Sequence, residues 1–339
     1  DASQRLWADI IFSRYHTLRD PDCIDTTVLP GELIAGYKNL LDQAQADSQV
    51  DPALIAERLT LPSVACLMEL APPDTALDIL VLYQARSAVK HTLALALMPA
   101  FETVCAVYRA GQPVSITPKA MAQRALRNCT LEYLVDTGDT QWLDRCYQQF
   151  EMANIMTDTM AALRCLVNSE IEYAAALKEK ALTAFYDRWQ HQPLAINQWL
   201  AVQASCPLPG TLAKVKALID HPAFDLKRPN QVLALVGSFA NHNTVNFHCL
   251  DGSGYAFLAD QVMVLNKINP QVASRTLARS PLINWRRYDD YQRQLMKTQL
   301  QRLQALPTLS PEVREVVEKC LWVEASPSSV IQNEAMCYE

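Results

Sequence analysis

Apolar residues return every three or four positions along most of this chain, and this spacing constrains the fold more than any other feature. In an α-helix, residues at that spacing fall on one face, which is then buried against a neighbour. Glycine is costly inside helices and supplies only 8 of the 339 residues, against a usual share of about 7%. We therefore predict roughly fifteen amphipathic helices. The clearest apolar stripes are Ala125, Cys129 and Tyr133; Met156, Met160, Leu163 and Val167; Leu212, Val215, Leu218 and Ile219; Tyr255, Leu258, Val262 and Leu265; and Met296, Leu300 and Leu303.

Several helix starts are marked by a capping residue followed by proline. The pairs Asp51–Pro52, Asn269–Pro270 and Ser310–Pro311 have this form. A short polar side chain accepts a hydrogen bond from a free N–H of the first turn, and proline lacks the N–H that would have no partner there. We predict that each of these pairs begins a helix.

The sequence contains no convincing alternating strand pattern and no repeat of fixed period. Many short helices without strands can form a globular bundle or a solenoid, and the number of helices favours the solenoid. We predict an all-α fold, an irregular α–α superhelix of paired helices similar to armadillo or HEAT repeats, with its concave face as the contact surface. Residues 1–321 should form one such domain, whereas residues 322–339 lack an apolar stripe and are predicted to be a mobile tail.

Composition excludes several functional classes. The net charge is −6 and there is no basic stripe, so a nucleic-acid partner is not expected. A membrane span needs about 18 apolar residues, and the longest candidate, Leu93 to Phe101, is shorter and contains Pro99. None of the ten cysteines forms a CxxC pair. Free buried thiols, and therefore a reducing, cytoplasmic location, are the preferred interpretation.

No catalytic or metal-binding motif is recognisable. None of the six histidines forms an HxxxH pair, and His242 and His248 could at most be a loop pair. The glycines of Asp251–Gly254 lack the Gly-Lys-Ser/Thr of a phosphate-binding loop, so we interpret this segment as a turn in which Ser253 caps the next helix. We therefore assign no catalytic residue and no metal ligand to this chain.

Several sequence blocks in a fixed order resemble a known family. They are DPALIAERLTLPS at 51–63, QRALRN at 123–128, ANIMTDTMAAL at 153–163, PNQVLALVGSF at 229–239, FHCLDGSGYAFL at 247–258, NKINPQVASR at 266–275 and WRRYDDYQRQ at 285–294. Together they resemble the C-terminal part of bacterial aminopeptidase N, the zinc-dependent alanyl aminopeptidases of the gluzincin class. The zinc-binding HExxH motif of that family is absent from this chain.

The resemblance implies a specific role. In that family the C-terminal domain is a helical superhelix that packs on the catalytic domain, closes over the active site and leaves an internal chamber with narrow openings. The whole enzyme removes N-terminal residues from peptides, using zinc and a glutamate that lie upstream. By resemblance, the partners of this chain are the upstream catalytic domain and peptide substrates. The chain alone is expected to lack zinc and peptidase activity.

Gln271 and Arg275 are the candidate substrate contacts. They lie four residues apart near the start of the helix predicted after Asn269, and so share one face. An amide, a guanidinium and a helix N-terminus suit a peptide backbone or a carboxylate. From spacing alone, the preferred interpretation is that Arg275 pairs with an internal acid and Gln271 faces solvent. The resemblance instead implies that both face the chamber, near the C-terminal side of a bound peptide, as positioning residues.

The sequence departs from the family pattern at one segment, and two other functional interpretations remain open. The family's PNRxRxLIGAF segment carries two arginines, which are replaced here by Gln231 and Leu233. That loss of charge is also compatible with a stand-alone helical-repeat scaffold that binds a protein or peptide in its concave face. A further alternative is a metal or hydrolase site formed across helices by residues distant in sequence.

Overall fold

The computed structural model describes residues 2–20, 28–45, 50–72, 75–108 and 114–322. They form α-helices α1 to α18, one π-helix and one 3-10 helix. The elements are α1 (Ala2–Arg19), α2 (Gly31–Gln45), α3 (Pro52–Leu59), α4 (Val64–Leu70), α5 (Ile79–Val107), α6 (Pro118–Asp136), α7 (Thr140–Met152), α8 (Met156–Asn168), α9 (Ala174–Trp189), α10 (Pro193–Ala204), α11 (Thr211–Ile219), α12 (Pro229–Val232), η1 (Leu233–Gly237), α13 (Ser238–His242), α14 (Thr244–Phe247), α15 (Ser253–Ile268), α16 (Pro270–Ala278), η2 (Pro281–Arg287), α17 (Asp290–Gln304) and α18 (Pro311–Leu321).

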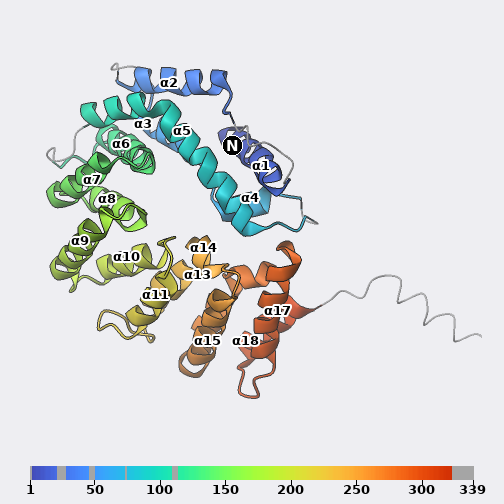
Figure 1. The fold of residues 1–339 in the computed structure, drawn as a ribbon. Coiled ribbons are helices and arrows are strands. Elements are labelled where there is room, and N and C mark those ends of the chain that lie inside the picture. The colour runs from blue at the N-terminus through green and yellow to red at the C-terminus, as the bar shows by residue number, and fades with distance from the viewer. Residues whose placement is uncertain (1, 21–27, 46–49, 73–74, 109–113, 323–339) are drawn as a thin grey trace, which may run out of the picture.

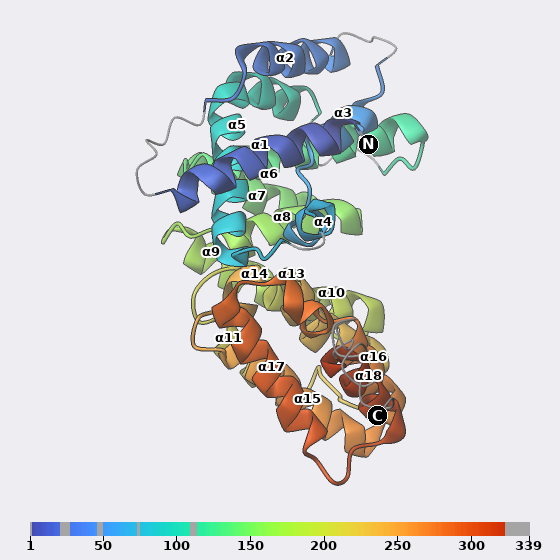
Figure 2. The same cartoon turned by 90° about the vertical axis from the view of Figure 1, so that its right-hand side faces the viewer.

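The helices follow one another in a curved array. Consecutive helices pack in pairs, among them α5 with α6, α7 with α8, α15 with α16 and α17 with α18. Figure 1 shows that the array curls, so that the last helices return beneath α4. Figure 2 shows the first half, α1 to α9, above the second half, α10 to α18. No strand occurs in the described part of the chain, where the sole β-type contact is an isolated bridge between Leu77 and Tyr288. The predicted all-α superhelix is confirmed.

The long helix α5 is the central support of the first half. It packs against α1, α2, α4 and α6, and it also contacts α14 from the second half. Its buried residues recur every three or four positions, among them Leu82, Val89, Leu93 and Phe101, and so form one broad face. This broad apolar face accounts for the number of helices that pack against α5. None of the described helices is long and apolar enough to cross a membrane.

The capping residues behave as predicted. Asp51, Asn269 and Ser310 are the N-caps of α3, α16 and α18, and each side chain accepts a hydrogen bond from a backbone N–H two or three residues later. Proline follows directly in all three helices. These predictions succeed because capping depends only on residues that are adjacent in sequence.

Most apolar stripes form the core, and one is partly misplaced. All four residues of the stripe that begins at Tyr255 are buried, as are Met296, Leu300 and Leu303. The stripe through Ala125 is wrong at its first position, because Ala125 is exposed and its neighbour Leu126 is fully buried. Burying one methyl group provides much less free energy than burying a leucine side chain, so α6 turns its leucine inward.

A buried polar network joins α6, α7 and α8. Arg127 Nη2 lies 2.6 Å from Asp158 Oδ1, with side chains only 7% and 10% exposed. Asn128 Nδ2 donates to the same carboxylate at 3.0 Å. Gln149 Nε2 donates to Asn128 Oδ1 at 3.0 Å and to the Asp158 carbonyl at 3.2 Å. Two of the blocks behind the family resemblance, QRALRN and ANIMTDTMAAL, therefore meet in the core, and their polar residues support the fold.

Glycine has a specific role at the start of α15. Gly252 is the N-cap, with a φ of 69° in the left-handed region. Our expectation that Ser253 caps this helix is wrong, since Ser253 is its first residue and its N–H donates to Asp251 Oδ1 at 2.9 Å. Next to it, a Cβ at Gly254 would lie 2.3 Å from the carbonyl oxygen of Phe247. The close crossing of these two segments requires a residue without a side chain.

The eight cysteines within the described ranges are all free thiols, and five of them are buried. Burial raises the pKa of the Cys105 thiol, which makes it unreactive. The prediction of a mobile tail at 322–339 concerns residues that, apart from Trp322, lie outside the described ones, and it stays a prediction.

Arg127→Met should lower the free energy of unfolding by about 3–5 kcal/mol, because it leaves the Asp158 carboxylate buried without its cation. Urea unfolding followed by circular dichroism measures this change. The double variant Arg127→Met with Asp158→Leu removes both charges and should lose less than the single variant. A single variant as stable as the parent protein would show that the ion pair is dispensable.

Gly254→Ala should lower stability by roughly 1–3 kcal/mol, because the new methyl group collides with the Phe247 carbonyl. Gly36→Ala in α2 is the matched control, since no atom lies within 4 Å of its Cβ position. That substitution should raise stability by roughly 0.5–1 kcal/mol, through the lower entropy of the unfolded chain. Thermal unfolding of both variants measures the two stability changes. Equal changes in stability would contradict the close contact between Gly254 and the Phe247 carbonyl.

Candidate functional site

Two adjoining cavities form one groove between the two halves of the superhelix. Their volumes are about 590 and 980 Å³, and both are lined by Tyr83, Arg86, His242 and Thr244. The walls come from α4, α5, α6 and α8 on one side and from α10, η1, α13 and α14 on the other, helices whose arrangement Figure 1 shows. We call this feature the concave groove.

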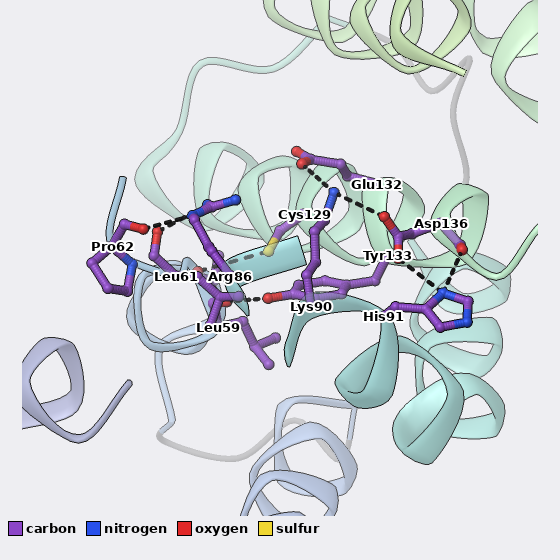
Figure 3. A network of polar contacts seen from close by, with 11 residues as sticks. Leu59, Leu61, Pro62, Arg86, Lys90, His91, Cys129, Glu132, Tyr133 and Asp136 are labelled. Carbon is purple, nitrogen blue, oxygen red and sulfur yellow. Dashed lines mark hydrogen bonds and ion pairs between the residues drawn. The ribbon is translucent and has the colours of Figure 1, made fainter. Parts of the chain in front are cut away.

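The smaller part of the groove carries charges of both signs. Lys90 Nζ on α5 lies 2.9 Å from Glu132 Oε1 and 3.6 Å from Asp136 Oδ1, both on α6 (Figure 3). His91 Nδ1 is 3.3 Å from Asp136 Oδ2. Partial burial favours the neutral form of Lys90, but the two carboxylates outweigh it and raise the pKa of Lys90 above its usual value. Partial desolvation favours the neutral form of Glu132, whose side chain is about half exposed, but Lys90 outweighs this effect, so the pKa of Glu132 is lowered.

Hydrogen bonds to backbone carbonyls hold this wall in place. Arg86 Nε donates to the Pro62 carbonyl at 2.6 Å, and Arg86 Nη2 donates to the Leu61 carbonyl at 3.3 Å (Figure 3). The buried hydroxyl of Tyr133 donates to the Leu59 carbonyl. The link between α3 and α4 is thereby fixed to α5 and α6, and the Arg86 guanidinium is held at the edge of the groove.

The larger part of the groove, the cavity of about 980 Å³, is lined by positive charge only among the described residues. None of the described residues that line it is Asp or Glu, whereas Arg86 and Arg279 both line it. Its surface also includes Leu194 and Leu233, which are 76% and 51% exposed. We call this part the acid-free half. Large apolar side chains exposed beside unbalanced positive charge are typical of a binding surface.

Gln231 and Leu233, where the family resemblance implies arginine, have different environments. Gln231 is buried, and its side chain accepts from the Asp225 N–H at 2.7 Å and donates to the Ala223 carbonyl at 2.9 Å. It therefore braces the turn before α12. Leu233 begins the π-helix η1 and lines the acid-free half. Of the two, only Leu233 contributes to the surface of the groove, and π-helical turns of this kind often occur at functional sites.

Gln271 and Arg275 both lie on α16 with exposed side chains. Among the described residues neither side chain has a hydrogen-bond or ion-pair partner, so Arg275 does not pair with an internal acid there. Neither residue lines the acid-free half, but Arg279, one helical turn beyond Arg275, does. The three residues follow each other at four-residue steps, and that spacing could have revealed Arg279 from the sequence. Contact of Gln271 and Arg275 with a substrate stays a prediction.

A contact between distant parts of the chain closes the superhelix near the groove. Leu77 N–H donates to the Arg287 carbonyl at 3.0 Å, and Asp289 N–H donates to the Leu77 carbonyl at 3.1 Å. Arg287 Nη2 also donates to the Ala71 carbonyl at 2.8 Å. We call these contacts the clasp. Tyr288 within it stacks on the buried His248, with ring centroids 5.1 Å apart.

The two histidines considered as a loop pair have separate environments. His248 is buried, and its Nδ1 lies 2.9 Å from the Tyr255 hydroxyl. His242 is exposed and lines the groove. Within the described ranges, no group of three or more His, Cys, Asp or Glu side chains is arranged to hold a metal ion.

Comparison with known proteins places the chain in a family. Residues 1–322 match the model described as "Domain of unknown function (DUF3458_C) ARM repeats". The chain is 36% identical over 278 residues to aminopeptidase N of Escherichia coli K12, which covers 81% of this chain and 30% of that protein. It is 33% identical over 321 residues to aminopeptidase N of Haemophilus influenzae, which covers 95% of this chain and 35% of that protein.

A solved structure supports the same family assignment. A crystal structure of Legionella pneumophila aminopeptidase A in complex with aspartic acid matches with a TM-score of 0.80 and 28% identity, over 94% of this chain and 36% of that one. The chain therefore belongs to the family of DUF3458_C ARM-repeat domains. Within that family, its likeness is to the C-terminal domain of aminopeptidase N. The chain spans about a third of the length of the relatives it matches.

The buried His248 should make the protein less stable in acid. Burial lowers the pKa of His248 to about 3, whereas the unfolded chain binds this proton near its usual pKa of about 6.5. Between these values the unfolded state holds more protons, so the free energy of unfolding falls as pH falls, by up to about 1.4 kcal/mol per pH unit.

His248→Gln should flatten this dependence, whatever its effect on stability at neutral pH. Urea unfolding measured at several pH values between 4 and 7 gives the slope. Tyr255→Phe is the matched control, because it removes the neighbouring hydroxyl but keeps the titrating ring. An unchanged slope in the His248 variant would show that another group controls the acid sensitivity.

Proposed function

We propose that this chain is the non-catalytic C-terminal domain of a zinc aminopeptidase, forming one superhelical domain over residues 1–321. It packs on an upstream catalytic domain, closes the active-site chamber and controls the access of peptides. The whole enzyme, in the cytoplasm, removes N-terminal amino acids from peptides. The observation that carries this proposal is the match to about a third of several aminopeptidase N relatives across nearly the whole chain.

Zinc belongs, in this proposal, to the upstream domain. The described residues of this chain do not form a group that fits a metal ion, so no step of the reaction is assigned to a metal held here. The contribution of this chain is instead geometric and electrostatic. The concave groove supplies a wall of the chamber, and the superhelix holds that wall in a fixed shape.

Gln271 and Arg275 act in this proposal as positioning residues for the part of the peptide that is remote from the cleaved bond. Both side chains are exposed on α16, and their four-residue spacing leads to Arg279 at the groove. A guanidinium that is free to bind a carboxylate or carbonyl oxygen aligns a substrate without taking part in its chemistry.

A second candidate function is a stand-alone scaffold that binds a peptide in the concave groove. Leu233 supports it, because the groove surface carries a leucine where the aminopeptidase segment carries arginine. The two candidates differ in what the gene encodes upstream. A reading frame with HExxH before this chain supports the enzyme, and its absence supports the scaffold.

Reconstitution tests the proposed function directly. The chain is mixed with a separately expressed catalytic portion from the same protein, and complex formation and alanyl-substrate hydrolysis are followed. We expect a complex with restored or altered activity, and no hydrolysis and no stoichiometric zinc for the chain alone. A folded, helical chain that forms no complex would favour the scaffold. Zinc at one equivalent together with hydrolysis by the chain alone would overturn the proposal.

Arg275→Gln in the reconstituted enzyme should raise KM for a pentapeptide by about tenfold, as expected for the loss of one charge-assisted hydrogen bond. Hydrolysis of a short alanyl substrate that does not reach α16 should be unchanged. Arg228→Gln is the matched control, since Arg228 is an exposed arginine that does not itself line the groove. Equal effects of the two variants on the pentapeptide would remove Arg275 from the list of substrate contacts.

A further inference from the structure

The acid-free half of the concave groove combines three features that recognise one kind of group. It carries positive charge without a lining carboxylate, it exposes apolar side chains, and it contains amide side chains. A peptide terminus of matching chemistry has a free carboxylate, an apolar last side chain and backbone N–H groups. We infer that the acid-free half binds the C-terminal residue of a peptide and selects an apolar side chain there.

Arg279 is the proposed carboxylate contact. It is the C-cap residue of α16, its side chain is exposed, and among the described residues the guanidinium has no hydrogen-bond or ion-pair partner. Arg86 contributes to the positive potential from the opposite wall, held by its bonds to the Leu61 and Pro62 carbonyls. Arg86 also faces Glu132 in the smaller half, whereas Arg279 has no such partner, so a carboxylate of the ligand meets the unpaired charge of Arg279 in a part of the groove that no described Asp or Glu lines.

Leu194 and Leu233 are the proposed contacts of the last side chain. They come from α10 and from the first residue of η1, two elements that pack against each other. Both side chains are mainly exposed, so covering them with an apolar group of the ligand removes apolar surface from water at no cost to the protein core. An arginine at position 233 would present charge to the same space. The preference for an apolar C-terminal residue therefore depends on Leu233.

Asn197 supplies a contact for the peptide backbone. Its side chain lines the acid-free half, and its Oδ1 is buried without a hydrogen-bond partner among the described residues. A buried acceptor without a donor is unfavourable, and an N–H of an extended peptide relieves this when the amide rotates toward the groove. The occupant is therefore a peptide end, in preference to a free inorganic anion.

This inference deepens the proposed function and rests on it for the biological role of the bound peptide. The binding site itself is tested on the complete 339-residue chain alone. The probe is a fluorescein-labelled Gly-Gly-Ala-Leu tetrapeptide with a free carboxylate, and binding is followed by fluorescence anisotropy. The comparison probes are the same peptide with a C-terminal amide and Gly-Gly-Ala-Ser with a free carboxylate.

We expect the free-acid leucine peptide to bind about tenfold more tightly than either comparison probe, since each lacks one of the two recognised groups. Arg279→Gln should abolish the preference for the free acid over the amide. Leu233→Ser should abolish the preference for leucine over serine. The matched controls are Arg228→Gln and Leu250→Ser, two exposed positions outside the groove lining, and they should keep both preferences.

Three outcomes would overturn the inference: no binding of any probe, equal binding of acid and amide, or equal effects of the groove variants and their controls. Because all the substituted side chains are exposed, loss of folding does not confuse the result. Formation of a complex with the catalytic portion is measured on the same samples. A complex without peptide selectivity removes only this inference, whereas selectivity without a complex removes the proposed function and leaves the site.

Discussion

The geometry of the concave groove depends on the clasp, a contact between parts of the chain that are 216 residues apart. Two backbone hydrogen bonds at Leu77 and the Arg287 guanidinium join the link before α5 to the end of η2. A solenoid held only by contacts between neighbouring helices can bend along its length. The clasp adds hydrogen bonds between distant parts of the array, which packing between neighbouring helices does not supply.

Within this array, the polar residues divide into those that hold the fold and those that face the groove. Arg127, Asp158 and Gln231 are buried and make ion pairs or hydrogen bonds with neighbouring residues, so their chemistry is used for structure. Arg279 and Leu233 present charge and apolar surface to the larger cavity. Gln231 and Leu233 are only two residues apart, yet one braces a turn and the other lines the site. The direction of the side chain, set by packing, decides the role.

This difference explains how much could be predicted from the sequence. Caps at Asp51 and Asn269 and the stripe from Tyr255 depend on residues close in the chain, and they were predicted correctly. The clasp and the Arg127–Asp158 pair depend on distant segments, and nothing in the local sequence indicates them. Ala125 was misplaced because periodicity alone does not weigh a methyl group against a leucine. The groove could be predicted only as a concave face, without its lining.

In the function that we propose, this superhelix closes a chamber whose wall is the concave groove. The most direct measurement is the reactivity of a thiol introduced by Leu233→Cys in the full-length enzyme, with the unsubstituted enzyme as background. A small maleimide and a maleimide on a large polymer are compared, and Leu250→Cys outside the groove lining is the reference. We expect position 233 to react with the small reagent but not with the polymer, and position 250 to react with both. Polymer labelling at 233 as fast as at 250 would contradict a closed chamber.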